Sequence, residues 1–382
     1  MQARVLSAEL RPAASPVQPA SKPASVLVSI QYLRALAAAM VLLHHVAWKG
    51  AQHGDNPLSW FSFGAAGVDL FFIISGYIMC EATDSRRIDF SSFMKARFFR
   101  IVPLYWLLSL AALFAFLLMP GKVNSSGGST DILNSFLLWP TAGKYLIQNG
   151  WTLSYEFLFY GLFALGLGCG RYRYVIAIAA IVALVLAGQW LEPQGVWGSF
   201  LTNAILLEFV MGIAAFHLFK RGFRAGAALS VALIAIAIAG FVFTGELEAG
   251  DPRVIGYGVP SLALFIAVRS LEGRTIRFDR SLAGKVAGAL GDSSYSMYLV
   301  HPFFLVAAST VLTQTGLASH GWLLIAVLFI GSMVTGWYCY AWLEKPMTQV
   351  VARMRRVGAS GSQPRVADLN SSAIRGAVTV RE

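Results

Sequence analysis

Ten apolar segments constrain the fold of this chain more than any other feature. With soft ends, they cover residues 29–48, 63–82, 101–119, 150–168, 173–190, 200–219, 226–243, 253–270, 293–314 and 322–343. A helix needs roughly 20 mainly apolar residues to cross the hydrocarbon core of a bilayer. Only 13% of the 382 residues are charged, against about a quarter in soluble domains. The sequence therefore predicts an all-α, polytopic membrane protein, a bundle of about ten transmembrane helices.

The Lys and Arg residues are distributed asymmetrically about these segments. If the N-terminus is cytoplasmic, 25 of the 30 fall on the cytoplasmic side, four on the outer side, and Arg34 within the membrane. Cytoplasmic loops of membrane proteins carry such an excess. We therefore expect both termini in the cytoplasm. The net charge of +11 is then explained by topology, and no nucleic-acid partner is expected.

The two ends of the chain differ in composition from the membrane region, which we place at 29–346. Residues 1–28 are rich in Ala, Pro and Ser and lack the apolar core of a signal peptide. We expect a disordered cytoplasmic tail there. Residues 347–382 are basic; we expect a second disordered cytoplasmic tail, which could touch anionic lipid. The three cysteines lie in or beside apolar segments, so no disulfide framework is expected.

The first apolar segment carries Arg34, His44 and His45. Ionisable side chains inside a bilayer are costly, and each is a functional-site hypothesis. Arg34 and His45 are eleven residues apart, so on a helix they share one face, about 16 Å apart along the axis. His44 points about 80° away from that face. One helix stripe therefore offers a cation near one side of the membrane and an imidazole near the other.

Chain direction converts the positions of the other buried polar residues into depth. Ser75 falls near mid-membrane in the second segment. The remaining residues form an outer group of His45, Asp69 and Glu156, and an inner or central group of Arg34, Glu208 and His301.

Several of these residues also allow a purely structural interpretation. Asp69 could pair with a neighbouring helix, and Glu208 could neutralise Arg34. Arg97 and Arg100 are three residues apart at the start of the third segment and share a helix face. They could be ordinary cytoplasmic anchors, or they could bind the phosphates of an anionic donor, for which the planar guanidinium is well suited.

Seven motifs occur in a fixed order over about residues 29–347. They read SIQYLRALAAAMVLLHH, GAAGVDLFFIISGYIM, FMKARFFRIVPLYW, GWTLSYEFLFY, LLEFVMGI, LGDSSYSMYLVHPFF and WLEKPM. With them, the chain resembles the acyltransferase-3 family of integral-membrane acyltransferases, in particular its exopolysaccharide-modifying branch. The spacing of Arg34 and His45 matches the signature of that family. Some members carry a second, extracytoplasmic domain; none is expected here.

The resemblance implies transfer of an acyl group, commonly acetyl, from cytoplasmic acyl-CoA to a sugar hydroxyl of an exopolysaccharide or a lipid-linked glycan at the inner (plasma) membrane. Acyl-CoA (acetyl-CoA) is then a co-substrate, and no bound cofactor or metal is expected. The expected partners are acyl-CoA, the glycan and the bilayer. The exopolysaccharide synthesis machinery is a further candidate partner.

This reaction assigns a role to each candidate residue. His45 is the general base or acyl carrier, because imidazole titrates near neutrality. Glu156 or Asp69 could hold its tautomer. Arg34 could stabilise the thioester oxyanion or hold the donor.

At the cytoplasmic mouth, Arg97 and Arg100 could bind the donor phosphates, and a pantetheine arm could thread outward to His45. The other substrate-binding candidates are Ser75, Glu208, Tyr295 and His301. Direct transfer and a covalent intermediate on His45 or Ser75 both remain open from the sequence.

Two other functions compete with the acyltransferase. A transporter could use Arg34, His45, Glu156 and His301 as an intramembrane relay, but the sequence shows neither repeated halves nor paired Gly/Pro-interrupted helices, which are typical of transporters. A scaffold for polysaccharide synthesis leaves the cost of Arg34 and His45 unexplained.

Overall fold

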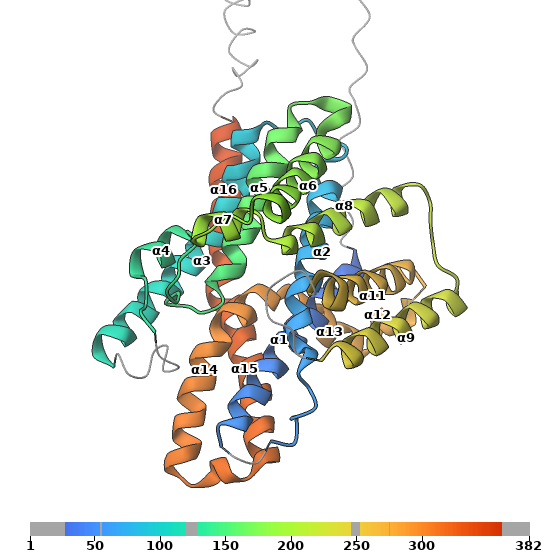
Figure 1. The fold of residues 1–382 in the computed structure, drawn as a ribbon. Helices are drawn as coiled ribbons and strands as arrows, with labels where there is room; N and C mark the ends of the chain where they lie inside the picture. Colours follow the sequence, from blue (N-terminus) through green and yellow to red (C-terminus); the bar gives the residue numbers. More distant parts are fainter. Residues whose placement is uncertain (1–26, 54–55, 120–127, 246–252, 275, 361–382) are drawn as a thin grey trace, which may run out of the picture.

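The computed structural model describes residues 27–53, 56–119, 128–245, 253–274 and 276–360 (Figure 1). Within them, regular structure is helical apart from one isolated β-bridge between Thr130 and Lys144. The longer helices are α1 (Val28–Ala51), α2 (Ala66–Thr83), α3 (Phe90–Leu118), α5 (Gly150–Leu167), α6 (Arg173–Leu191), α8 (Leu207–Lys220), α9 (Ala227–Thr244), α11 (Val259–Ser270), α13 (Leu282–Asp292), α14 (Ser294–Gln314), α15 (Gly321–Cys339) and α16 (Lys345–Ser360). The short ones are η1 (Phe63–Ala65), α4 (Ile132–Leu137), η2 (Gly170–Tyr172), α7 (Val196–Leu201), η3 (Ala204–Leu206), η4 (Val254–Gly258), α12 (Ile276–Arg280), η5 (Leu317–Ser319) and η6 (Tyr340–Glu344). The all-α class predicted from the sequence is confirmed.

Eight helical stretches in the described residues are long and apolar enough to cross a membrane. They are Val28–Ala51, Phe63–Thr83, Phe90–Leu118, Gly170–Leu191, Val196–Lys220, Ala227–Thr244, Ser294–Gln314 and Gly321–Met354. The other two expected spans are also helical. One is α5, whose 18 residues include Glu156, and the other is the shorter apolar helix Val254–Ser270. All ten apolar segments are thus helices, and eight of them are candidate spans by length and composition.

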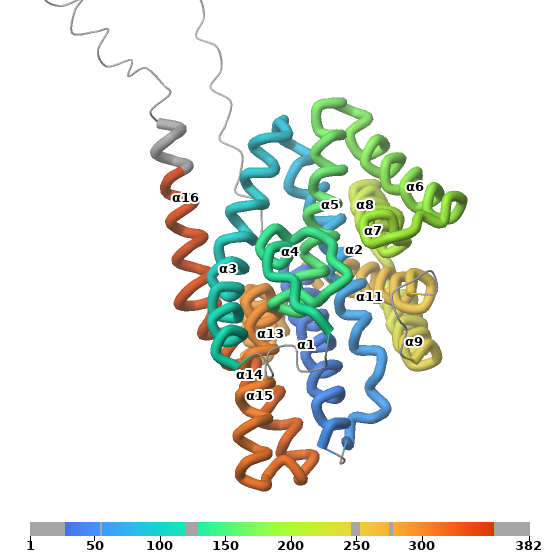
Figure 2. The backbone as a smooth tube through the Cα atoms, turned by 60° about the vertical axis from the view of Figure 1, so that its left-hand side comes forward, coloured from blue at the N-terminus to red at the C-terminus, as the bar shows by residue number. Residues whose placement is uncertain are grey.

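The connections between consecutive helices gather at two opposite ends of the molecule. Figures 1 and 2 place the α1–α2 and α14–α15 connections at one end and the α2–α3 and α5–α6 connections at the other. Helices that cross a bilayer in succession must alternate in this way, so the arrangement fits a membrane bundle.

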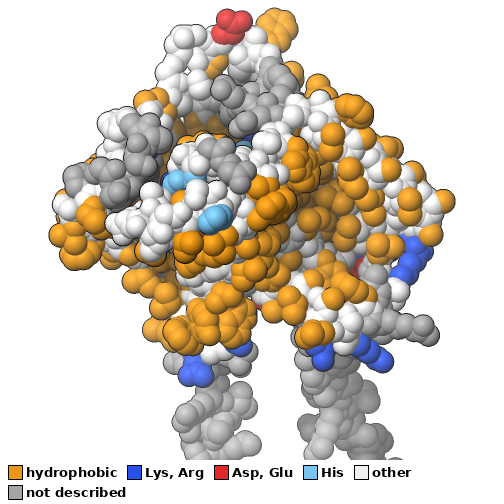
Figure 3. All heavy atoms as spheres, turned by 90° about the horizontal axis from the view of Figure 1, so that it is seen from below, with side chains coloured by type: hydrophobic (Ala, Val, Ile, Leu, Met, Phe, Trp, Pro, Cys, Tyr) orange, Lys and Arg blue, Asp and Glu red, His pale blue; other side chains and the backbone are white. Residues whose placement is uncertain are grey.

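The surface of the protein is mostly apolar. Figure 3 shows hydrophobic side chains over much of the face seen from below, with the few visible Lys and Arg side chains at its edge. Phe243 and Trp190 have exposed fractions of 89% and 85%. Exposed apolar area on this scale is unusual for a soluble monomer and suits helices surrounded by lipid.

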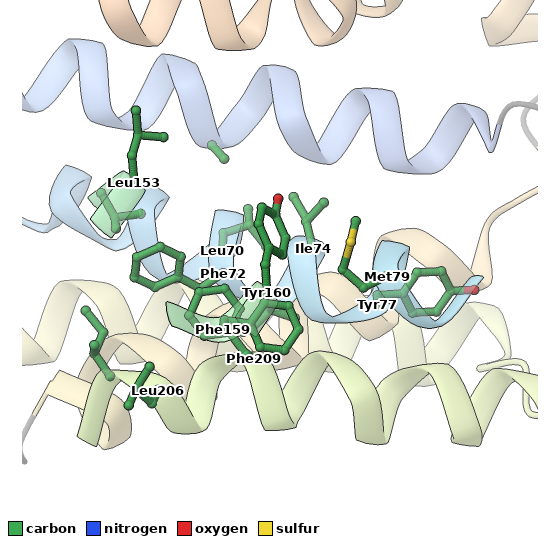
Figure 4. Packing of buried hydrophobic residues seen from close by; sticks show 14 of the residues in the cluster. Leu70, Phe72, Ile74, Tyr77, Met79, Leu153, Phe159, Tyr160, Leu206 and Phe209 are labelled. Atoms are coloured by element: carbon green, nitrogen blue, oxygen red, sulfur yellow. The ribbon is translucent and has the colours of Figure 1, made fainter. Parts of the chain in front are cut away.

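The centre of the bundle depends on a close approach of α2 and α8. A Cβ atom on Gly76 would fall against the carbonyl oxygen of Phe209, and one on Gly212 against that of Ile73. Beside this contact, the rings of Phe159 and Phe209 stack with centroids 4.2 Å apart (Figure 4). Small residues that let helix backbones touch are the usual packing device in membranes, and here they fix α2, which contributes residues to the site.

The last span is longer than the sequence predicts. α15, the π-helical turn η6 and α16 follow one another without a break as far as Ser360. The disorder expected for 347–382 therefore does not extend to residues 347–360, which are helical. Pro346 lies in the first turn of α16, next to the π-helical turn, where a missing N–H is tolerated. Residues 1–26 and 361–382, which complete the two expected tails, lie outside the described residues.

Candidate active site

A cavity of about 200 Å³, which we call the arginine cavity, brings together residues from α1, α2, α3, α5 and α14. Its polar lining includes Arg34, Ser75, Arg97, Arg100, Thr152, Glu156, Tyr160, Ser294, Tyr295 and Tyr298. Six of these were predicted as site residues from the sequence: Arg34, Ser75, Arg97, Arg100, Glu156 and Tyr295. The cavity therefore joins candidates from five separate helices.

Arg100 is held by a carboxylate that the sequence analysis did not single out. Its Nη1 lies 2.5 Å from Oε1 of Glu344, and the Ser296 hydroxyl donates to Oε2 of the same carboxylate at 2.6 Å. Glu344 is almost fully buried and ends the π-helical turn η6. π-turns inside helices occur frequently at functional sites, and this one aims Glu344 at α3.

Arg34 and Arg97 form no close ion pair among the described residues, although Glu156 lines the same cavity. Arg34 has one long hydrogen bond, 3.4 Å to Gln31. The Arg97 guanidinium lies 5.7 Å from the centre of the Phe93 ring, and its buried Nε has no hydrogen-bond partner. Among the described residues, no carboxylate oxygen lies within 4.0 Å of either side chain. The arginine cavity therefore carries excess positive charge, which favours an anionic ligand.

Glu156 is engaged within the arginine cavity. The Ser75 hydroxyl donates to its Oε1 at 3.1 Å, and the Tyr160 hydroxyl donates to the same oxygen. Ser75 and Glu156 are both half-buried, whereas Tyr160 is buried. The carboxylate thus holds two hydroxyl groups at the wall of the cavity, on the face of α5 that looks toward α2.

A second, larger cavity of about 380 Å³ lies between α1, the end of α3, residues 146–149 and α14. We call it the histidine cavity. Its lining is mostly apolar, and the polar or aromatic residues in it are His45, Trp48, Lys49, Gln148, Asn149, His301, Phe303 and Thr310. Small-molecule sites combine mostly apolar and aromatic surface with a few hydrogen-bonding groups, and this lining supplies both.

The two histidines of this cavity are hydrogen-bonded to each other, and the donor and acceptor of that bond can be assigned. His301 Nδ1 lies 3.0 Å from the carbonyl oxygen of Met297, and His301 Nε2 lies 3.0 Å from His45 Nδ1. A carbonyl only accepts, so Nδ1 of neutral His301 carries the hydrogen and its Nε2 accepts from His45 Nδ1. This assignment leaves Nε2 of His45 with the free lone pair of a base.

Asp69 and Glu208 belong to a separate buried cluster and line neither cavity. Asp69 makes a two-pronged ion pair with Arg253, at 3.0 Å to Nε and 2.6 Å to Nη2. Glu208 is fully buried and lies against the Asp69 carboxyl, and among the described residues no N–H or hydroxyl donates to its two oxygens. The cluster ties α2 and α8 to η4, so its contacts are those of helix packing.

The structure groups the polar residues differently from the outer and inner groups predicted from the sequence. Glu156 lies with Arg34 in the arginine cavity, His301 pairs with His45, and Glu208 lies near Asp69. Neither carboxylate considered for His45 contacts it; His301 takes that place.

Several contributing residues were missed from the sequence. Glu344 lies in the quoted motif WLEKPM, and its carboxylate directly after the last apolar segment was an available signal. Arg253 is one of the four Lys and Arg residues that the charge distribution places on the outer side. Tyr298, Thr152 and Asn149, which lie between the cavities, offered no signal, because uncharged polar side chains are common in membrane helices.

Residues 27–341 match a family model described as an acyltransferase domain. The chain belongs to the acyltransferase-3 family. The match covers every helix that lines the two cavities, so this multi-pass membrane protein is an acyltransferase.

Three relatives from bacteria are similar to this acyltransferase. The exopolysaccharide production protein ExoZ of Rhizobium meliloti is 34% identical over 339 residues, which is 83% of this chain and 98% of ExoZ. Nodulation protein 10 of Rhizobium leguminosarum bv. viciae is 29% identical, over 84% of this chain and 94% of that protein. The O-acetyltransferase OatA of Staphylococcus aureus is 25% identical over 75% of this chain, which spans about half (52%) of OatA. No solved structure shows a significant match.

Proposed function

We propose that the protein is a ten-span inner-membrane O-acyltransferase with both termini cytoplasmic. It moves an acyl group, commonly acetyl, from cytoplasmic acyl-CoA to a sugar hydroxyl of an exopolysaccharide or lipid-linked glycan. The observation that carries this proposal is the His45–His301 pair, because it leaves a lone pair on a histidine that lines a cavity. A hydroxyl bound in that cavity would meet a base already in the required tautomer.

The arginine cavity supplies the donor site in this proposal. Arg34 and Arg97 carry charge without a carboxylate partner, and Arg100 is positioned by Glu344. Arginine binds phosphate oxygens through two parallel hydrogen bonds. The phosphates of coenzyme A would lie at Arg97 and Arg100, on the α3 side, and the pantetheine arm would pass Arg34 toward His45.

The chemical step then needs three events. His45 Nε2 takes the proton of the acceptor hydroxyl while the hydroxyl oxygen adds to the thioester carbonyl. The tetrahedral intermediate collapses, the C–S bond breaks, and the thiolate takes the proton back from His45. His301 holds the imidazole orientation throughout through the His45 Nδ1–H bond, the role that a carboxylate has in serine hydrolases. The products are the O-acyl sugar and free coenzyme A.

The names of the relatives agree with this assignment. ExoZ is described by exopolysaccharide production, which suits a polysaccharide acceptor and the synthesis machinery as a partner. OatA is described as an O-acetyltransferase, which suits an acetyl group and an ester product.

The first test is coenzyme A release by detergent-purified protein given acetyl-CoA, with and without a crude exopolysaccharide acceptor. We expect release that rises with acceptor, and a fall in kcat of about 10²–10⁴-fold in His45→Ala, the usual contribution of a positioned acid–base group. In His301→Ala, we expect a fall in kcat toward the lower end of that range, with little change in KM for acetyl-CoA. His320→Ala, an exposed histidine in the α14–α15 connection, is the control. No release with any acyl donor from folded protein would overturn the proposal and favour a transporter.

A further inference from the structure

Three side chains close the space between the two cavities. Tyr298 and Thr152 line the arginine cavity, whereas Asn149 and His301 line the histidine cavity. The Thr152 and Tyr298 hydroxyls are 2.7 Å apart, and Asn149 Nδ2 donates to the backbone carbonyl of Tyr298 at 2.7 Å. All three are buried, with exposed fractions of 8% or less. We call this set the tyrosine partition.

A proline explains why the partition forms at this point. Pro302 lies inside α14, four residues after Tyr298, and has no N–H to offer to the Tyr298 carbonyl. The Asn149 side chain supplies the missing donor. Pro302 therefore creates both the break in the helical ladder and the contact that brings residues 149–152 against α14.

The Tyr298 ring stands between the two reaction partners. Its centroid lies 6.0 Å from that of Phe71 in α2, which lines the arginine cavity, and 6.2 Å from that of His301, which lines the histidine cavity. The hydroxyl is fixed by Thr152 and, more weakly, by the Asn149 carbonyl at 3.5 Å. Asn149 Nδ2 binds only the backbone, so the ring can turn away while that bond persists.

We propose that the tyrosine partition is a coupling gate between the donor and acceptor cavities. This inference rests on the proposed function, since it takes the arginine cavity as the donor site and His45 as the base. The thioester can reach His45 only when Tyr298 turns aside, and the Tyr298–Thr152 hydrogen bond favours the closed position. With the gate closed, a donor bound at the arginines is shielded from water and from acceptors in the histidine cavity.

A gate that opens too easily has a chemical consequence. Water from the histidine cavity would reach the thioester when no acceptor is bound. It would add to the carbonyl, the C–S bond would break, and a carboxylic acid and free coenzyme A would leave. Futile hydrolysis without acceptor therefore reports gate opening separately from transfer.

The catalytic test breaks the same hydrogen bond from either end, in Tyr298→Phe and Thr152→Val. We expect acceptor-independent hydrolysis of acetyl-CoA to rise about fivefold in both, the equilibrium shift that corresponds to one hydrogen bond, while the ratio of transfer to hydrolysis falls. Tyr105→Phe is the matched control, because that buried tyrosine of α3 also loses one hydrogen bond, to the Ser135 carbonyl, outside both cavities. Unchanged hydrolysis in both partition variants would overturn the gate.

A second test needs no acyl transfer, so it separates failure of the gate from failure of the proposed function. Ser75→Cys reports access to the arginine cavity and Thr310→Cys access to the histidine cavity, each in a Cys169→Ser background. A membrane-impermeant methanethiosulfonate is added to sealed vesicles from the side of the α14–α15 connection. Thr310→Cys should react throughout, and Ser75→Cys should react faster when Thr152→Val or Tyr298→Ala is added. Equal reaction of Ser75→Cys with and without these changes would overturn the gate even if transfer were confirmed.

Discussion

At the scale of single residues, the ionisable groups inside the bundle are of two kinds: those held in an ion pair, and those that face a cavity without one. Asp69 is satisfied by Arg253 through two hydrogen bonds in a fully buried position. Arg34 and Arg97, in contrast, face a cavity without a carboxylate partner. A charge inside a membrane is retained for packing or for function, and these contacts distinguish the two. We therefore propose that Asp69 stabilises the fold and that the two arginines bind a ligand.

Asp69→Asn should destabilise the protein far more than Glu208→Gln. The first leaves Arg253 buried without its counter-ion, a loss of about 3–5 kcal/mol. The second replaces a carboxyl that lies against Asp69 and accepts from no N–H or hydroxyl in the described residues. Because the new amide can donate to the Asp69 carboxylate, we expect at most a small shift in the unfolding temperature. Thermal unfolding of the detergent-purified variants measures both, with coenzyme A release normalised to folded protein. A stable Asp69→Asn that has lost transfer would contradict this and return Asp69 to the active site.

The sequence predicted polar residues that line the two cavities better than it predicted their partners. His45, Arg34 and the arginines of α3 could be found because a charge in an apolar segment is conspicuous in a single chain. The pairing of His45 with His301 could not, because it depends on which helices are neighbours and on the rotation of each. Depth alone placed His301 in the inner or central group, whereas in the structure its ring lies 3.0 Å from that of His45.

At the scale of helices, α2 is the element on which the site depends, and glycines set its position. Gly76 and Gly212 let α2 and α8 meet backbone to backbone, and Ser75 is the residue next to the contact. Hydropathy predicted both helices, but not the contact, since glycines are frequent in membrane helices. The Ser75–Glu156 hydrogen bond is 3.1 Å long, and a shift of α2 by the width of a methyl group would disturb its geometry.

Gly212→Ala should therefore destabilise the bundle. The added Cβ would strike the carbonyl oxygen of Ile73, which is backbone and cannot rotate away, and overpacking of this kind costs about 1–3 kcal/mol or more. We expect a lower unfolding temperature in detergent and reduced transfer per molecule. Gly161→Ala on α5 is the matched control, because its Cβ would meet nothing within 4 Å. Equal unfolding temperatures for the two variants would contradict the close contact of α2 and α8.

At the scale of the whole molecule, the proposed roles of the two cavities require a defined orientation of the bundle in the membrane. The α2–α3 and α5–α6 connections share one end of the bundle, and the α1–α2 and α14–α15 connections share the other. Arg97 and Arg100 lie in the first half of α3, near the connection from α2. His45 lies near the C-terminal end of α1, close to the connection to α2. The excess of Lys and Arg at the first end supports the proposed orientation, in which this end faces the cytoplasm and the acyl donor. The histidine cavity would then lie toward the outer side.

The native Cys169 offers a check of this orientation. Cys169 is exposed in the α5–α6 connection, whereas Cys80 and Cys339 are buried, so a membrane-impermeant maleimide should label only Cys169. We expect labelling in inside-out vesicles and almost none in right-side-out vesicles, with Cys169→Ser unlabelled in both. Ser319→Cys in that background, an exposed position between α14 and α15, should show the opposite pattern. If both positions reacted from the same face, the α5–α6 and α14–α15 connections would share a side of the membrane. The arginines and the histidine pair would then no longer belong to opposite faces, and the route of the donor from Arg97 to His45 would have to be abandoned.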